Sequence, residues 1–217
     1  MSLRSSREQV AIEAGDVLAR TGPIGAAGNR QLVARVNDAT LLDGAAGLLA
    51  FVLDYLRDSG AEIHDGDTLQ YGYWSVRFTA SPDAIELWER DDDYSGYVRG
   101  VDRAVRFWTA QWEACVERGS GFDPPHADGL AVAAKDIFTA PRLNAIRYEA
   151  REHTTGWWFL TDSFTGDLEQ MAPQHLHHLT AHYPVLARHL ALDVGWVVHW
   201  DGKQVKTGWK PTEDGES

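Results

Sequence analysis

Residues 129–209 hold five of the nine tryptophans of this 217-residue chain, and most of them fall on segments in which apolar and polar side chains alternate. The clearest example is Trp196, Val198 and Trp200, which run into Asp201-Gly202, a dipeptide typical of tight β-hairpins. An alternation of period two places one set of side chains on one face of a sheet. The sequence therefore predicts a packed sheet that ends in a hairpin.

The same region contains further strand and helix signals. Residues 130–134 and 157–160 are apolar runs that predict buried strands, whereas Ile146 and Tyr148 alternate with Arg147 and predict a strand with a charged outer face. The spacing of Leu176, Leu179 and Tyr183 predicts a helix, and a second short helix is expected from Pro184, containing Leu186 and Leu190.

The first half of the chain has a comparable mixture of signals. Ser5 and Glu8 have the spacing of a capping box, so a helix is expected over about residues 7–20. Thr40 and Asp43 resemble a second cap, before an apolar helix that Gly60 should end.

Two strands and a third helix should complete this half. Residues 74–80 and 84–90 have strand alternation, with Ile85 and Leu87 on one face and Glu86 and Trp88 on the other. Across 101–118, a helical stripe is predicted from the residues Val101, Val105, Trp108, Trp112 and Cys115. Cys115, the only cysteine, is expected in the core and not as a reactive thiol.

Residues 119–125 combine glycine and proline and are predicted to be a linker. We therefore expect an α+β protein with two lobes, residues 1–122 and 123–217, each a small, mainly antiparallel sheet packed against helices.

The chain carries 32 acidic and 20 basic residues, for a net charge of −12. Nucleic acid and anionic membranes attract clustered Lys and Arg, so neither is an expected partner, whereas a basic protein would be attracted. No apolar run approaches the roughly 20 residues that span a bilayer, and the N-terminal residues lack the apolar core of a secretory signal. A cytoplasmic location is expected.

Asp91, Asp92 and Asp93 precede Tyr94 and Tyr97 in an acidic loop. The loop lacks the ligand spacing of a calcium site, so we expect a solvated turn or a contact surface for a basic protein. Trp158 and Asp162 form a second candidate contact patch.

The helix predicted from Leu176, Leu179 and Tyr183 should bring three histidines near one another: His175, His178 and His182. Three imidazoles can bind zinc, but the accompanying motif of a zinc enzyme is missing, so surface histidines are expected. The sequence shows no arrangement of nucleophile, base and orienting group, and we predict no catalytic residues, no metal and no cofactor.

Residues 129–202 contain three short motifs, Lys135-Asp136-Ile137, Arg147-Tyr148-Glu149 and Thr155-Gly156-Trp157, and further on Pro184 and Gly195. In this order they resemble the immunity-protein-thirty-three-like family of bacterial polymorphic toxin systems. The resemblance implies a non-enzymatic, antitoxin-like role in which the protein binds a cognate toxin protein, and the acidic loop at Asp91–Tyr97 is the favoured contact surface. It implies no catalytic residues.

Two other functions remain open. Aromatic residues at a lobe boundary would suit a module that binds a small molecule or peptide. A hydrolase would have to use the histidine-rich helix with Asp162, Asp167 or Glu169.

Overall fold

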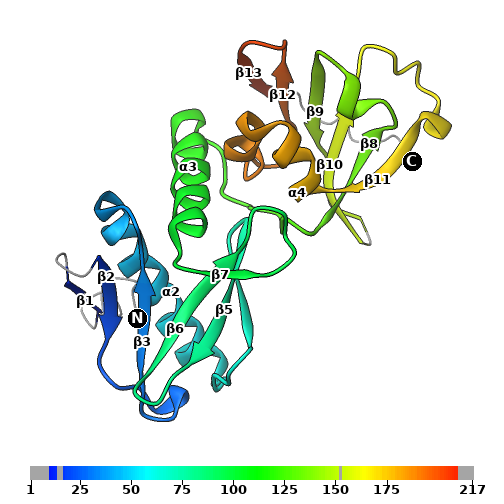
Figure 1. The fold of residues 1–217 in the computed structure, drawn as a ribbon. Helices are drawn as coiled ribbons and strands as arrows, with labels where there is room; N and C mark the ends of the chain where they lie inside the picture. The colour runs from blue at the N-terminus through cyan, green and yellow to red at the C-terminus, as the bar shows by residue number, and fades with distance from the viewer. Residues whose placement is uncertain (1–9, 14–16, 152, 210–217) are drawn as a thin grey trace. The chain divides into compact units, whose positions relative to one another are not determined.

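The computed structural model describes residues 10–13, 17–151 and 153–209, and the chain divides into two compact units, Met1–Thr109 and Ala110–Ser217. We call them unit 1 and unit 2. Each unit combines a mixed sheet with helices, which confirms the predicted α+β class with two lobes (Figure 1). The division between the units lies within a helix, α3 (Asp102–Arg118), whereas the predicted boundary at 122/123 lies after it.

The sheet of unit 1 has the order β1-β2-β3-β6-β5-β4, with β7 paired to β6. Neighbouring strands are antiparallel, except that β3 and β6 are parallel. The strands are β1 (Val10–Glu13), β2 (Leu18–Thr21), β3 (Gln31–Arg35), β4 (Thr68–Tyr71), β5 (Trp74–Ala80), β6 (Ala84–Arg90) and β7 (Tyr97–Arg99).

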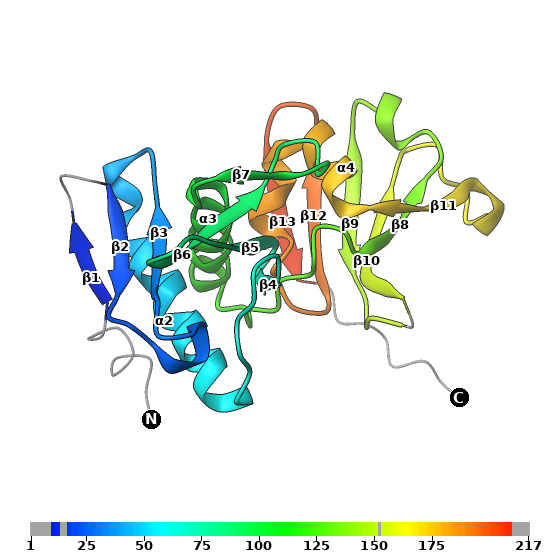
Figure 2. The same cartoon turned by 60° about the horizontal axis from the view of Figure 1, so that its bottom comes forward.

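Helix α2 (Leu42–Ser59) packs along β1, β2 and β3 (Figures 1 and 2), as the apolar stripe predicted. It ends at Gly60, whose φ of 68° is the left-handed conformation expected of a helix C-cap. By length and composition, the segment Ala39–Ser59 could cross a membrane, but half of it is buried inside the structure, as in the core helix of a folded domain.

Aromatic side chains join α2, β4 and the first turns of α3. The ring of Tyr71 stacks on Trp108 at 4.3 Å between centroids, and Phe51 contacts both rings. Gly44 allows the two helices to approach, because a Cβ there would lie 2.2 Å from Cγ1 of Val105. Both helices therefore share the core of unit 1.

The prediction of a helix over residues 7–20 is wrong for the residues in this range that the structure describes. Val10–Glu13 and Leu18–Thr21 form an antiparallel pair of strands instead. Leu18 and Ala19 are buried beside α2, so pairing and burial override the local helical pattern. The predicted capping box at Ser5 and Glu8 lies outside the described residues.

The second predicted cap is also misplaced. The Asp38 side chain accepts the backbone N–H of Thr40 and caps a short 3-10 helix (Ala39–Leu41) that leads into α2. Thr40 itself donates its hydroxyl to Asp38. The side-chain cap at the start of this helical segment is thus Asp38, two residues before the predicted Thr40.

The stripe predicted for α3 needs one correction. Trp112 is 51% exposed, whereas Gln111 is fully buried. Cys115 is buried as predicted, and burial raises the pKa of its thiol to about 11, so it is protonated at neutral pH.

The sheet of unit 2 has the order β11-β8-β10-β9-β12-β13, which confirms a central position for β10 and the terminal hairpin of β12 and β13. Only the pairing of β8 with β10 is parallel among these described strands. The strands are β8 (Leu130–Ala134), β9 (Leu143–Arg147), β10 (Thr154–Leu160), β11 (Met171–His175), β12 (Trp196–Trp200) and β13 (Val205–Trp209).

Helix α4 (Leu176–His182) and the 3-10 helix η6 (Pro184–His189) follow β11, and their predicted apolar side chains are buried. Short 3-10 turns occupy Gly25–Ala27, Ile137–Thr139 and Leu168–Gln170. Strand β11 was not predicted, since its sequence MAPQH shows no alternation of apolar residues.

Glu89 is the main unforeseen feature of unit 1. It shares the inward face of β6 with Ile85 and Leu87 and is 5% exposed. Its Oε2 accepts the backbone N–H of Ala104 at 2.7 Å, in the first turn of α3. Burial raises the pKa of Glu89 to about 7, although the hydrogen bonds from the first turn of α3 oppose the shift.

We expect the Glu89→Gln variant to lose part of the pH dependence of stability. Between pH 4.5, the ordinary pKa of this carboxyl, and about 7, folded Glu89 keeps a proton that the unfolded chain releases, so the stability of unit 1 falls as pH rises. The wild type should lose about 3 kcal/mol of unfolding free energy between pH 4 and pH 8 through this group, and the variant should not lose it. Urea unfolding at both pH values, followed by amide signals of unit 1, measures this difference.

Glu86→Gln is the matched control, because Glu86 lies on the opposite face of β6 and pairs with Arg35 and Arg99. It should leave the slope in place. An unchanged slope in the Glu89 variant would contradict the assignment.

Candidate functional site

Residues of the family-like motifs meet at a buried polar network in unit 2. Arg147 is 4% exposed and donates from Nη1 to the carbonyl of Leu190 at 3.2 Å. The indole Nε1 of Trp157 donates to the same carbonyl at 2.9 Å. Because both donors lie in the sheet, they attach the end of η6 to β9 and β10.

Two further contacts complete this network. Nη2 of Arg147 lies 2.7 Å from Oδ2 of Asp123, and Nε2 of the buried Gln111 donates to the carbonyl of Ala187 at 2.7 Å. Burial lowers the pKa of Arg147, and the charge of Asp123 opposes this shift. The predicted outward position of Arg147 is therefore wrong: Arg147 faces the core and the neighbouring Ile146 is partly exposed.

Gly156 is required where β10 bends toward the segment after β9. Its φ is 79°, and a Cβ there would lie 2.2 Å from the carbonyl oxygen of Tyr148. The register of β10 against β8 shifts at this point, between Thr154 and Trp158. Glycine thus provides both the left-handed conformation and the space that this irregularity needs.

The Lys135-Asp136-Ile137 motif also supports the fold. Asp136 accepts hydroxyl hydrogen bonds from Thr161 at 2.9 Å and Ser163 at 2.6 Å, which hold its pKa below the ordinary value. The hydroxyl of Tyr183 donates to the carbonyl of Ile137 at 2.5 Å. Asp136 and Ile137 thus connect this motif to the loop after β10 and to Tyr183, whereas Lys135 is exposed.

The acidic loop is organised by contacts within unit 1. Asp91 and Asp93 both accept hydrogen bonds from Ser95, and Asp92 forms an ion pair with Arg103. The rings of Tyr94 and Tyr97 lie 4.7 and 4.4 Å from the guanidinium carbon of Arg90. The five predicted site residues therefore contact arginines and Ser95 of their own unit. Their role in partner contact stays a prediction.

Trp158 and Asp162 lie in and just after β10. Trp158 is half-buried and makes an edge contact with Tyr148, at 5.9 Å between ring centroids, and Tyr148 is 39% exposed. Asp162 is exposed in the following loop. Tyr148, which directly follows the last residue of β9, was not predicted as part of this patch.

The histidines cluster differently from the prediction. His177 packs with His175 and His178, at 5.4 and 4.2 Å between ring centroids, whereas His182 contacts Phe138 and Tyr183. Within the described part of the chain, no group of three or more His, Cys, Asp or Glu side chains is arranged to hold a metal ion.

Unit 2 also has a surface groove of about 460 Å³ that the sequence did not indicate. Trp209, 60% exposed on β13, stands beside Trp196 and Arg118. Arg118 is held by a 2.6 Å hydrogen bond to the hydroxyl of Thr207. The residues that line this groove are Arg118, Gly119, Ser120, Gly121, Asp193, Val194, Trp196 and Trp209.

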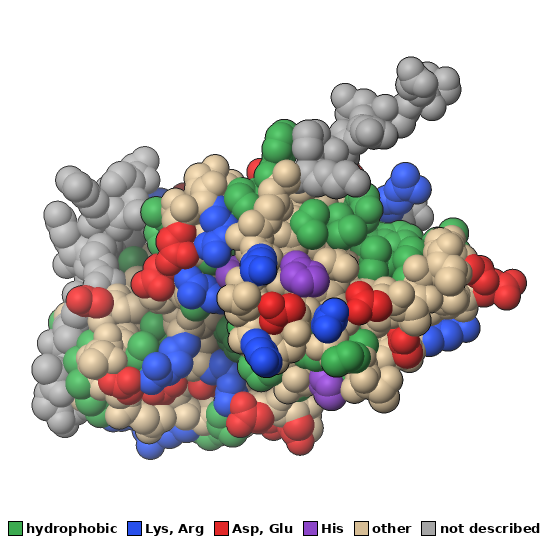
Figure 3. Space-filling view, turned by 90° about the horizontal axis from the view of Figure 1, so that it is seen from above, with side chains coloured by type: hydrophobic (Ala, Val, Ile, Leu, Met, Phe, Trp, Pro, Cys, Tyr) green, Lys and Arg blue, Asp and Glu red, His purple; other side chains and the backbone are tan. Residues whose placement is uncertain are grey.

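Acidic and basic side chains are interspersed with hydrophobic ones on the face shown in Figure 3. The net charge of −12 therefore does not appear there as one continuous acidic field. Mixed charges of this kind would not attract a basic partner to this face from a distance.

Residues 110–211 match the Imm33-like domain, which confirms the family resemblance of the C-terminal part of the chain. The match covers the whole described part of unit 2, including the Arg147 network and the groove. No curated protein and no solved structure is significantly similar to the chain.

We expect Gly156→Ala to destabilise unit 2 by at least about 2 kcal/mol, because the added Cβ meets a backbone carbonyl that cannot move aside. Thermal unfolding measures the loss. Gly166→Ala is the matched control: Gly166 has a φ of 93° but open space around it. Equal losses in the two variants would mean that backbone conformation alone, and not the close contact, requires glycine at 156.

Proposed function

We propose that the protein is a bacterial immunity protein that neutralises a cognate toxin by direct contact and catalyses no reaction itself. The observation that carries the proposal is the match of residues 110–211 to the Imm33-like domain. We place this protein in the cytoplasm. Its net charge of −12 favours a basic toxin as the partner.

The exposed aromatic groove of unit 2 supports a role in protein contact. Tryptophan and arginine are enriched among the residues that dominate binding energy at interfaces. Trp209 and Arg118 occupy such positions within the matched residues, and Arg118 is already ordered by Thr207. A side chain that is fixed before binding loses less entropy in the complex.

The test is co-expression of the full-length protein with the C-terminal domain of a secreted modular protein encoded beside its gene. We expect it to restore growth to cells that produce this domain, and to form a stable complex with the domain in calorimetry. Trp209→Ala should weaken the complex roughly 30-fold or more if the groove is the contact surface.

Two variants separate the surfaces. Leu168→Ala removes another exposed apolar side chain of unit 2, at 67% exposure, and should leave the affinity unchanged. A variant in which Asp91, Asp92 and Asp93 are all replaced by lysine tests the acidic loop. Absence of both protection and binding by the wild-type protein would overturn the proposed function.

A further inference from the structure

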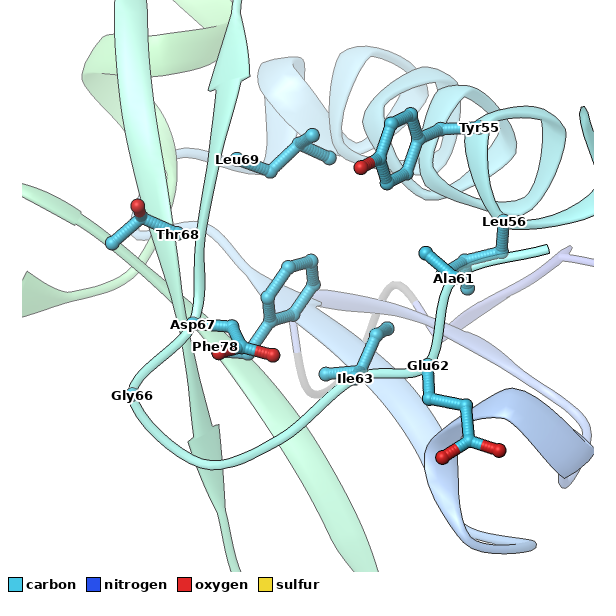
Figure 4. A pocket seen from close by; sticks show the side chains of 10 residues that line it. All are labelled: Tyr55, Leu56, Ala61, Glu62, Ile63, Gly66, Asp67, Thr68, Leu69 and Phe78. Carbon is cyan, nitrogen blue, oxygen red and sulfur yellow. The ribbon is translucent and has the colours of Figure 1, made fainter. Parts of the chain in front are cut away.

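Unit 1 contains a pocket of about 450 Å³ between the end of α2, the loop that follows it, and strands β4 and β5 (Figure 4). It lies outside the residues that match the Imm33-like domain. The lining residues are Tyr55, Leu56, Ala61, Glu62, Ile63, Gly66, Asp67, Thr68, Leu69 and Phe78.

The floor of the pocket is apolar and preformed. Leu56, Ile63 and Phe78 are each less than 10% exposed, so their positions are fixed by the core of unit 1. Tyr55 is 44% exposed and extends its ring over the pocket opposite Leu69 (Figure 4). An aliphatic chain could lie on this floor without any rearrangement of the core.

The charged groups of the pocket are all acidic. The carboxylate of Asp67 points toward the floor beside Phe78, whereas Glu62 stands at the open rim (Figure 4). Among the described residues, Glu62 has no hydrogen-bond or ion-pair partner for its carboxylate, and no Lys, Arg or His lines the pocket. The pocket therefore offers negative charge next to an apolar floor.

Nearby cations do not neutralise these two carboxylates. Arg57 is held by Asp54 at 2.6 Å and Asp58 at 2.9 Å. Arg77 neighbours Phe78 on β5, so the alternation of the strand directs it away from the floor of the pocket. Its guanidinium carbon lies 5.8 Å from the centre of the Tyr97 ring, and its Nη2 lies 3.4 Å from where a Cβ of Gly66 would be, but it forms no ion pair with Glu62 or Asp67 among the described residues. The imidazole of the exposed His64 contacts one of the carboxylates, with Nδ1 3.5 Å from Oδ2 of Asp67.

We infer that this pocket receives an arginine side chain presented by the protein partner. Its aliphatic stem would lie on Phe78 and Leu69 next to the ring of Tyr55, and its guanidinium would reach the carboxylate of Asp67, with the charge of Glu62 at the rim adding to the attraction. Arginine fits this arrangement better than lysine, because its planar group can donate two parallel N–H···O bonds to one carboxylate. The identity of the partner as a toxin rests on the proposed function, whereas the chemistry of the pocket does not.

A direct test uses the full-length, isotope-labelled protein and the peptide acetyl-Gly-Arg-Gly-amide in an NMR titration. We expect saturable shifts of the amides of Gly66, Asp67 and Leu69, with a dissociation constant on the order of millimolar. The same peptide with citrulline, which is neutral and of nearly equal shape, should shift them little. Equal shifts by both peptides, or shifts confined to other residues, would overturn the inference.

The double variant Glu62→Gln, Asp67→Asn should bind the arginine peptide at least about fivefold more weakly. Asp83→Asn is the matched control, an exposed aspartate in the turn before β6, and should bind as the wild type does. Because Asp67 also accepts the N–H of His64 at 2.8 Å, Glu62→Gln alone provides a variant that leaves this turn intact. Undiminished binding by both variants would contradict the assigned carboxylates.

Binding of the wild-type protein and of the double variant to the toxin distinguishes failure of this inference from failure of the proposed function. If the wild-type protein binds the toxin and the double variant binds it equally well, the pocket is not the contact, although the function stands. If the arginine peptide binds at the pocket but no toxin does, the pocket chemistry stands and its partner is not a toxin.

Discussion

The fold of unit 2 depends on one set of buried hydrogen bonds, those received by the carbonyls of Ala187 and Leu190. Gln111, Arg147 and Trp157 provide the donors, from α3, β9 and β10. Each donor is almost completely excluded from water, so an unmade bond would leave a buried polar group without a partner at a cost of about 1–3 kcal/mol. Sheet, helix and η6 are therefore stabilised together and not one by one.

Much of the fold could be predicted from local patterns, because alternation and helical spacing report burial directly. The hairpin at Asp201-Gly202 and the helix that Gly60 ends are both present. The pattern failed for β1 and β2, where pairing along α2 decided the structure. It also failed for Arg147, because a charged residue on a strand was assigned to the surface although its side chain is buried and pairs with the exposed Asp123.

Glu89 and Arg147 show why the candidate sites could not be obtained in the same way. The alternation itself placed Glu89 in phase with Ile85 and Leu87, but which partner would compensate its charge depends on α3, 13 or more residues later in the chain. The pocket at Tyr55 and the groove at Trp209 are formed by three or more separate segments. Concavity of this kind arises from tertiary packing and leaves no periodic signal in the sequence.

The motif residues of the Imm33-like part of the chain differ from the residues that we propose to contact a partner. Arg147, Gly156 and Trp157 are buried or sterically confined, so substitutions there change stability before they change any surface. A loss of protection in such variants would report unfolding and not a lost contact. Binding must be tested at exposed positions such as Trp209 and Glu62, where truncation leaves the core intact and a change in affinity can be assigned to the partner.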